Sequence, residues 1–301
     1  MASSFAAFVA LARPAQWIKN GFVLVGLFFA HAWNDPVLSH AAFLCFAGFC
    51  LVSSAVYSFN DIMDREADRV HAEKHTRPVA SGAVGVRAAT VFALLLLVGG
   101  LALAALAAQA VFGIVFTYAV LNLGYSLGLK HIPLLDVVII ASGFMLRILA
   151  GTLGIGIAPS DWLLLCGFML TLFLGFAKRR AELSALVAAR LRYEPSEQAV
   201  PEARRVLSGY SLAFLDRAIA VCAAAAVLAY AWYTLDPRTI ALHGTASLVL
   251  TVPFVLYGMG RYLWLLYRQG RGEDPSAELL RDPHLIAAVA GWLVVAAILL
   301  R

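Results

Sequence analysis

Of the 301 residues, 62% are hydrophobic and only 14% are charged. Such a composition excludes a water-soluble enzyme, because too few polar residues remain to coat a globule. The formal net charge of +5 does not indicate nucleic-acid binding, since the basic residues gather between apolar runs, where membrane topology accounts for them. We therefore expect an integral membrane protein that binds no nucleic acid.

Apolar runs separated by polar or Gly/Pro breaks predict nine membrane-spanning segments. They cover residues 21–33, 40–59, 88–108, 110–128, 134–153, 162–177, 211–234, 242–267 and 284–300. Backbone groups cannot stay unpaired in lipid, so each segment is expected to be a helix. The predicted fold is all-α, with one bundle of nine helices that forms a single domain over residues 1–301.

The basic residues predict the orientation of this bundle. With a cytoplasmic N-terminus, nearly every Lys and Arg falls in cytoplasmic segments, and the odd number of spans places the C-terminus outside. The opposite segments carry almost none, apart from Arg238. Three long polar segments, 60–87, 178–210 and 268–283, are then expected to meet on the cytoplasmic face and to form a cap over an active site.

Four polar side chains follow the second span at close spacing: Asn60, Asp61, Asp64 and Asp68. On a helix, at about 100° per residue, they fall within an arc of roughly 100° and face one way. Oxygen ligands gathered in this way suit Mg²⁺ that bridges to a diphosphate. The alternative is a solvated helix end, neutralised by ordinary pairs with Arg65, Arg69 and Lys74.

A basic run, which contains Lys74 and Arg77, comes directly after the acidic residues. Carboxylates for a metal beside cations for phosphate oxygens are what a metal-diphosphate site requires, and this combination favours a functional interpretation. The pattern Asn60-Asp61-x-x-Asp64-x-x-x-Asp68, followed by Lys74 and Arg77-Pro78, resembles the first aspartate-rich motif of the UbiA-type intramembrane transferases. That resemblance implies a diphosphate substrate bound through Mg²⁺, beside a lateral opening for a polyprenyl chain.

Aromatic prenyltransferases of that superfamily carry a second aspartate-rich motif after the sixth span. Here the chain reads Lys178-Arg179-Arg180-Ala181-Glu182, with three cations and one carboxylate. The cations suit direct contacts to anionic oxygens, with Glu182 one helical turn from Lys178 to orient it. The alternative is a positive-inside anchor at a helix end.

Further motifs resemble the decaprenyl-phosphate phosphoribosyltransferase branch of the superfamily. They are Arg13-Pro14-x-Gln16-Trp17-x-Lys19-Asn20, Ser54-Ala55-Val56-Tyr57, the Lys-Arg-x-x-Glu run, Gly128-Leu129-Lys130-His131, Arg147 and Arg281-Asp282. This resemblance implies transfer of 5-phosphoribose from phosphoribosyl diphosphate to a polyprenyl phosphate, with release of diphosphate. It also implies a multi-pass protein of the bacterial cytoplasmic membrane whose site faces the cytoplasm; a homo-oligomer is left open.

The predicted metal ligands are Asn60, Asp61, Asp64 and Asp68. The candidate substrate-binding residues are Lys19, Tyr57, Asn60, Lys74, Arg77, Tyr125, Lys130, Arg147, Lys178, Arg179, Arg180 and Glu182. Arg147 stands out because an ionisable group within an apolar span is costly, which indicates a functional site or an internal partner on another helix.

Two other functions compete with phosphoribosyl transfer. A prenyltransferase would use a prenyl diphosphate donor and an aromatic or other acceptor, but the missing second acidic motif argues against it. A secondary transporter would need broken spans in matching halves and charged groups at mid-membrane, where only Arg147 qualifies.

Overall fold

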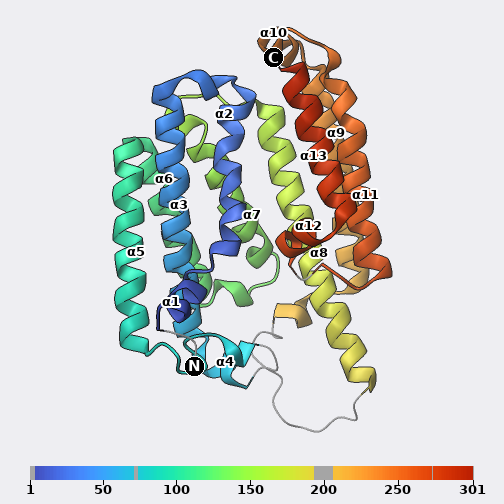
Figure 1. Cartoon of the computed structure of the whole chain (residues 1–301). Helices are drawn as coiled ribbons and strands as arrows, with labels where there is room; N and C mark the ends of the chain where they lie inside the picture. The colour runs from blue at the N-terminus through green and yellow to red at the C-terminus, as the bar shows by residue number, and fades with distance from the viewer. Residues whose placement is uncertain (1–3, 71–73, 193–205, 273, 301) are drawn as a thin grey trace. The chain divides into compact units, whose positions relative to one another are not determined.

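The computed structural model describes residues 4–70, 74–192, 206–272 and 274–300, and within these ranges the secondary structure is entirely helical (Figure 1). The chain forms two compact units, Met1–Pro159 and Ser160–Arg301. The single domain expected over residues 1–301, capped by three loops, stays a prediction, and residues 193–205 of the second loop lie outside the described residues.

Unit 1 begins with a short helix and a long 3₁₀ segment and continues with four long helices. Its elements are α1 (Ser4–Ala12), η1 (Pro14–Leu24), α2 (Val25–Phe29), η2 (Ala32–Asn34), α3 (Pro36–Met63), α4 (Arg65–Arg69), η3 (Lys74–Thr76), α5 (Val86–Ala107), α6 (Gln109–Leu127), η4 (Leu129–His131), α7 (Leu135–Ala150) and η5 (Leu153–Ile155). Figure 1 shows α1 and α4 at the same end of α3.

Unit 2 is built on α8, the longest helix of the described chain. Its elements are α8 (Asp161–Arg192), η7 (Val206–Gly209), α9 (Leu212–Leu235), α10 (Pro237–His243), η8 (Ser247–Thr251), α11 (Val252–Arg268), α12 (Pro275–Arg281) and α13 (Pro283–Leu299). The N-termini of α9 and α13 are capped by Ser211 and Asp282, whose side-chain oxygens accept backbone N–H bonds.

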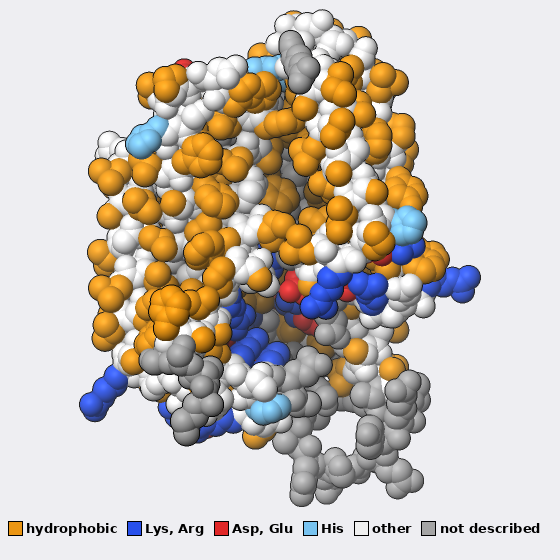
Figure 2. All heavy atoms as spheres, viewed as in Figure 1, with side chains coloured by type: hydrophobic (Ala, Val, Ile, Leu, Met, Phe, Trp, Pro, Cys, Tyr) orange, Lys and Arg blue, Asp and Glu red, His pale blue; other side chains and the backbone are white. Residues whose placement is uncertain are grey.

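Seven helices in the described part of the chain are long and apolar enough to cross a membrane. They are Pro36–Met63, Val86–Ala107, Gln109–Leu127, Leu135–Ile155, Asp161–Ala188, Leu212–Leu235 and Ser247–Arg268. These helices confirm the second to eighth predicted spans and a multi-pass membrane protein. Figure 2 agrees, because hydrophobic side chains cover most of the visible face, and in unit 1 Lys and Arg gather toward the end at which α1 and α4 lie.

The first and last predicted spans differ from the other seven. The last is an apolar helix of 17 residues, Pro283–Leu299. The first, residues 21–33, falls on the end of the 3₁₀ segment η1, on the five-residue α2 and on the start of the 3₁₀ turn η2, although continuous α-helix was expected. At about 2.0 Å rise per residue for 3₁₀ and 1.5 Å for α-helix, η1 and α2 together reach roughly 30 Å. The count of nine helices and the sides on which the termini lie stay predictions.

Helix α3 lies at the centre of unit 1 because small residues let α5 approach it closely. A side chain at Gly48 would meet the backbone oxygen of Gly100 at 2.9 Å, and one at Gly100 would meet Val52 at 2.6 Å. Such small-residue contacts are typical of helix pairs in membranes. The buried cluster around Phe49 and Tyr118 joins α3 to α6. This packing fixes the helix whose end carries the acidic motif.

Candidate active site

The acidic motif lies where α3 ends and α4 begins. We call Asn60, Asp61, Asp64 and Asp68 the acid centre. Asn60 and Asp61 belong to the last turn of α3, and Asp64 separates the two helices. The chain keeps a helical course through this junction, since the N–H of Asp64 bonds to the carbonyl of Asn60 (2.9 Å) and that of Asp68 to Asp64 (2.8 Å). The predicted helical stripe is therefore nearly continuous, with one break at Asp64.

Two carboxylates of the acid centre share one guanidinium. Asp61 and Asp68 are both buried, with 1% and 4% of their surface exposed. One nitrogen of Arg77 lies 2.7 Å from Asp68 and 3.2 Å from Asp61. A single cationic atom therefore bridges two carboxylates that belong to different helices. Arg77 was predicted beside the acidic motif, and the structure places it there.

A second cation reaches Asp61 from the N-terminal segment. Arg13 lies 2.5 Å from the Asp61 carboxylate, and its guanidinium lies over the ring of Tyr57, 5.3 Å from the ring centroid. Arg13 adopts the left-handed conformation (φ 52°), which non-glycine residues rarely adopt. The following Pro14 disfavours the α region at Arg13, so α1 ends here and the chain turns into η1. The turn brings the side chain of Arg13 to α3.

The third carboxylate, Asp64, has partners of its own. Lys130 of η4 lies 2.5 Å from one oxygen of Asp64, and the amide nitrogen of Asn60 donates to the other at 2.9 Å. Ser126 of α6 in turn donates to the Asn60 amide oxygen at 3.2 Å. Lys130 was predicted as a substrate-binding residue from a motif 66 positions away, and the structure brings it into contact with the acid centre.

The alternative of ordinary, solvated ion pairs applies to Glu66 and not to the acid centre. Arg65 and Arg69 both pair with Glu66, which is exposed, and the hydrogen bond from Arg65 holds the pKa of Glu66 below its usual range. Neither arginine forms an ion pair with an acid-centre carboxylate among the described residues. Solvated surface pairing therefore accounts for Glu66, whereas the buried acids are neutralised by Arg13, Arg77 and Lys130.

The acid centre meets one requirement of a metal site and lacks another. The Oδ2 atom of Asp61 is buried and has no hydrogen-bond partner among the described residues, so it has free capacity for a cation. The position between Asp61 and Asp68 already holds a positive atom. Within the described ranges, however, no three His, Cys, Asp or Glu side chains converge as a ligand set. The carboxylates fit a cation held by Asp61 and Asp68, with Asp64 outside this pair.

The remaining residues predicted in unit 1 are distributed around this centre. Tyr57 contacts Arg13, and Lys74 begins η3 three residues before Arg77. Lys19 on η1 and Tyr125 on α6 are half-buried. Arg147 is buried in α7, and its side chain donates to Asn20, to Tyr118 and to the carbonyl of Gly143. Its side-chain partners lie on other elements, as predicted for an ionisable group in a span.

In unit 2 the residues Lys178, Arg179 and Arg180, here called the basic cluster, lie on α8. Arg179 is buried and lies 2.5 Å from Glu182. Glu182 was expected to orient Lys178, the residue before Arg179. Arg180 donates to Asp216 of α9 at 2.7 Å and lies over the ring of Tyr267, 4.1 Å from its centroid. The Tyr267 hydroxyl donates to the same Asp216 oxygen at 2.9 Å.

Two charged residues of these sites were missed in the sequence. Arg13 stands in a quoted motif but was not assigned to the acidic stripe, since its contact to Asp61 spans 48 positions. Asp216 carried a usable signal, because an acid near the start of an apolar span is costly and indicates a partner. Its partners are Arg180 and Tyr267.

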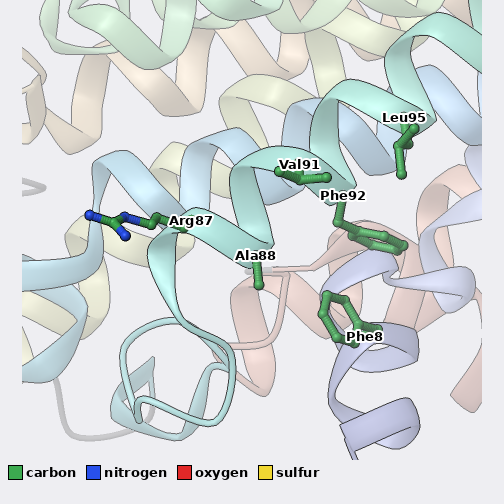
Figure 3. A pocket seen from close by; sticks show the side chains of 6 residues that line it. All are labelled: Phe8, Arg87, Ala88, Val91, Phe92 and Leu95. Atoms are coloured by element: carbon green, nitrogen blue, oxygen red, sulfur yellow. The ribbon is translucent and has the colours of Figure 1, made fainter.

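A shallow pocket of about 480 Å³ lies on α1 and α5 of unit 1 (Figure 3). Its lining residues are Phe8, Arg87, Ala88, Val91, Phe92 and Leu95. The rings of Phe8 and Phe92 pack edge to face, with centroids 5.1 Å apart. None of the predicted site residues lines this pocket, so its apolar wall belongs to the packing of α1.

Buried carboxylates interleaved with cations at the end of one span of a multi-pass helical protein are the arrangement expected of an intramembrane transferase that binds a metal-diphosphate. The chain is a member of the UbiA prenyltransferase family, whose model matches residues 20–190. It is 32% identical over 294 residues to a decaprenyl-phosphate phosphoribosyltransferase of Corynebacterium glutamicum, covering 93% of this chain and 82% of that protein. It is 30% identical over 298 residues to the enzyme of the same name from Mycolicibacterium smegmatis, covering 93% and 88%.

The fold agrees with this family. A UbiA homolog from Archaeoglobus fulgidus bound to DMAPP and Mg²⁺ superposes with a TM-score of 0.71 at 18% identity, covering 97% of this chain and 98% of that chain. The chain is therefore an enzyme of the UbiA family, a membrane transferase, and the transporter alternative is set aside.

Proposed function

We propose that the protein transfers 5-phosphoribose from phosphoribosyl diphosphate to a polyprenyl phosphate and releases diphosphate. One observation carries the proposal: buried Asp61 and Asp68 share a nitrogen of Arg77, while Arg13 also pairs with Asp61 and Lys130 pairs with the neighbouring Asp64. Carboxylates for a metal and cations for phosphate oxygens thus alternate within one site, which suits a metal-diphosphate. The names of the relatives support the choice of sugar donor and lipid acceptor.

Asp61 and Asp68 are the residues that would hold Mg²⁺ in this site, and Asn60 and Asp64, the other predicted ligands, lie beside them in the chain. When bound, it would neutralise the charge that develops on the departing diphosphate. Arg77 and Arg13, which neutralise Asp61 and Asp68 here, would be placed to contact the phosphate oxygens of the diphosphate. Lys74, next to Arg77, is proposed to contact the same diphosphate.

The reaction forms one bond and breaks another at C1 of the ribose. An oxygen of the lipid phosphate attacks C1, and the bond from C1 to the diphosphate oxygen breaks, so that the electron pair leaves with the diphosphate. The lipid phosphate is already anionic at neutral pH and needs no strong general base. Positioning by Lys19, Tyr57 and Tyr125, together with electrostatic stabilisation by the cations, therefore supplies most of the catalysis.

The basic cluster of unit 2 is proposed to receive the remaining phosphate, either the ribose 5-phosphate or the lipid phosphate. Lys178 and Arg179 offer direct donors, and Glu182 holds Arg179 in place. The charge pattern of the sequence assigns both the basic cluster and the acid centre to the cytoplasmic face of a bacterial cytoplasmic membrane. The polyprenyl chain would extend from there into the bilayer.

The second candidate is transfer of a prenyl group from a prenyl diphosphate. The structural relative bound to DMAPP is the observation that favours it. The decisive experiment supplies purified protein with Mg²⁺ and polyprenyl phosphate, and with either phosphoribosyl diphosphate or a prenyl diphosphate. We expect diphosphate release and a phosphoribosylated lipid, detected by mass spectrometry, only with the ribosyl donor. Prenylated product in place of phosphoribosylated lipid would overturn the proposal. Trp162→Phe, a change on α8 at a hydrogen bond to Asp236, serves as the active control.

A further inference from the structure

The N-terminal segment contacts one stripe along the second half of α3. Three of its residues make these contacts: Arg13, Trp17 and Asn20. Their partners on α3 follow each other at helical spacing: Cys50, Ser53, Ser54, Tyr57 and Asp61. The two segments run antiparallel, so Asn20 meets the middle of α3 and Arg13 meets the acid centre. We call these contacts the polar ladder.

The 3₁₀ geometry of η1 explains why its residues can follow α3 in this way. A 3₁₀ helix has three residues per turn, so Trp17, Asn20 and Val23 stand in one row. Asn20 and Val23 are buried, and Trp17 donates from its indole N–H to Ser54 at 3.0 Å. Runs of 3₁₀ helix longer than four residues are uncommon, and η1 has 11. Tertiary contacts therefore hold this segment in place.

Arg147 is the anchor at the inner end of the ladder. Its Nε donates to the Asn20 amide oxygen at 2.7 Å, and a terminal nitrogen donates to the Tyr118 hydroxyl at 3.0 Å. Asn20 then has only its amide nitrogen left to donate, and it does so to Cys50 and Ser53, each at 3.3 Å. The amide of Asn20 is thereby fixed in one orientation.

The charge of Arg147 has no carboxylate partner within the described part of the chain. Its guanidinium instead lies over the rings of Tyr118, Phe144 and Phe49, at 4.6, 5.4 and 5.5 Å from their centroids. A buried cation in a span is costly, and aromatic faces with three hydrogen bonds offset part of that cost. All three side-chain nitrogens of Arg147 donate hydrogen bonds, so this residue fixes the side chains of Asn20 and Tyr118.

We propose that Arg147 and Trp17 are positioning residues, which act through Asn20 and Ser54 to hold Arg13 against Asp61. This inference rests on the proposed function in that Asp61 belongs to the metal-diphosphate site. It replaces the direct substrate contact predicted for Arg147 with an indirect role. Ser54 joins the two halves of the ladder, since it accepts from Trp17 and donates to the carbonyl of Ala12 at 2.6 Å, directly before Arg13.

The test uses two variants. Trp17→Phe keeps an aromatic ring and removes the indole N–H. Arg147→Lys keeps the positive charge and removes the planar guanidinium with its several N–H donors. We expect each to raise the apparent KM for the ribosyl diphosphate donor about tenfold, the effect of one lost hydrogen bond, while the KM for polyprenyl phosphate stays unchanged. Trp162→Phe, which removes an indole N–H bond to Asp236 in unit 2, is the matched control with wild-type constants.

A double-mutant cycle of Trp17→Phe and Ser54→Ala sharpens the test. If the two residues act through their hydrogen bond, the double variant is no worse than Ser54→Ala alone. Titration with Mg²⁺ and inorganic diphosphate gives a second readout that needs no sugar donor, so failure of the proposed reaction is distinguishable from failure of this inference. Wild-type affinity in Trp17→Phe and Arg147→Lys, or a lowered melting temperature with unchanged affinity, overturns the positioning role.

Discussion

The acid centre of unit 1 and the basic cluster of unit 2 each lie on a long, apolar helix, but they pair their charges differently. In the acid centre, Asp61 receives two cations and Arg77 serves two carboxylates, so the charges are shared. In unit 2 the pairs Arg180–Asp216 and Arg261–Asp282 each join one cation to one acid. Shared pairs can exchange one cation for another, whereas one-to-one pairs fix the helices that carry them.

The comparison depends first on both sites facing the same side of the membrane, and cysteine labelling tests this with an all-or-none result. We expect Ser81→Cys, in the exposed segment after Arg77, and Ser196→Cys, in the 190–200 segment, to react only from the cytoplasmic side. Arg238→Cys should react only from the other side. The measurement is labelling by an impermeant maleimide in oriented vesicles, in a background without the four native cysteines. Reaction of positions 196 and 238 from one side would contradict the nine-span topology.

The next largest effect, a loss of kcat, is expected when a carboxylate of the acid centre is neutralised. Asp61→Asn and Asp64→Asn should lower kcat about 10²- to 10³-fold, because each removes a charge that holds the metal or its neighbouring cations. Both residues lie at the end of α3, so we expect the protein to stay folded and to elute as wild type in size-exclusion chromatography. Glu66→Gln, which changes an exposed acid of the same segment, is the matched control. Full activity of Asp61→Asn at limiting Mg²⁺ would remove the metal-ligand assignment.

A smaller effect is expected in the basic cluster. Lys178→Ala and Arg179→Ala should raise the apparent KM for one of the two substrates, since a charge-assisted hydrogen bond contributes about 1.5–3 kcal/mol, or roughly 10- to 100-fold. Arg179→Ala also removes the ion pair to Glu182, so its effect includes the loss of that pair. Glu182→Gln should act more mildly, as it keeps a hydrogen-bond acceptor.

Restoring an acidic pair separates a phosphate-binding cluster from a topological anchor. The double variant Lys178→Asp with Glu182→Asp introduces the second aspartate pair of prenyl-transferring relatives, and its carboxylates should repel a phosphate. We expect no phosphoribosyl transfer from this variant under steady-state assay. If it retained activity, the basic cluster would serve only the orientation of α8, and the case against a prenyl diphosphate donor would lose its main support.

The sequence predicted the acid centre because its residues lie close together in the chain. Asp61, Asp68 and Arg77 fall within 17 positions, and helical spacing alone brings the two acids to one side. Arg13 was not assigned to them, because its approach depends on a left-handed turn before Pro14 that no periodicity reveals. The 3₁₀ geometry inside the first predicted span, residues 21–33, was missed because hydropathy over 13 residues does not distinguish a period of 3.0 from 3.6.

The smallest effect is expected at Asp282, a one-to-one pair that also caps α13. Arg261 donates to its carboxylate, and the N–H groups of His284 and Leu285 donate as well. These bonds, that of Arg261 first, lower the pKa of Asp282 to about 2. A lowered pKa means that the charge stabilises the folded protein above the ordinary Asp value of about 3.9, and that this stabilisation disappears as the pH falls through about 2.

Asp282→Asn keeps a capping side chain and removes the charge, so we expect a loss of roughly 1 kcal/mol near neutral pH. The difference in melting temperature between wild type and this variant, measured in detergent by intrinsic fluorescence, should shrink below about pH 4 and vanish near pH 2. Asp35→Asn is the matched control, because Asp35 caps α3 in the same way and forms no ion pair among the described residues. A difference that persisted unchanged to pH 2 would mean that Asp282 acts through its cap alone. Because α13 is not part of either site, turnover of Asp282→Asn should match wild type. We expect this ion pair between one cation and one acid to affect stability and not catalysis.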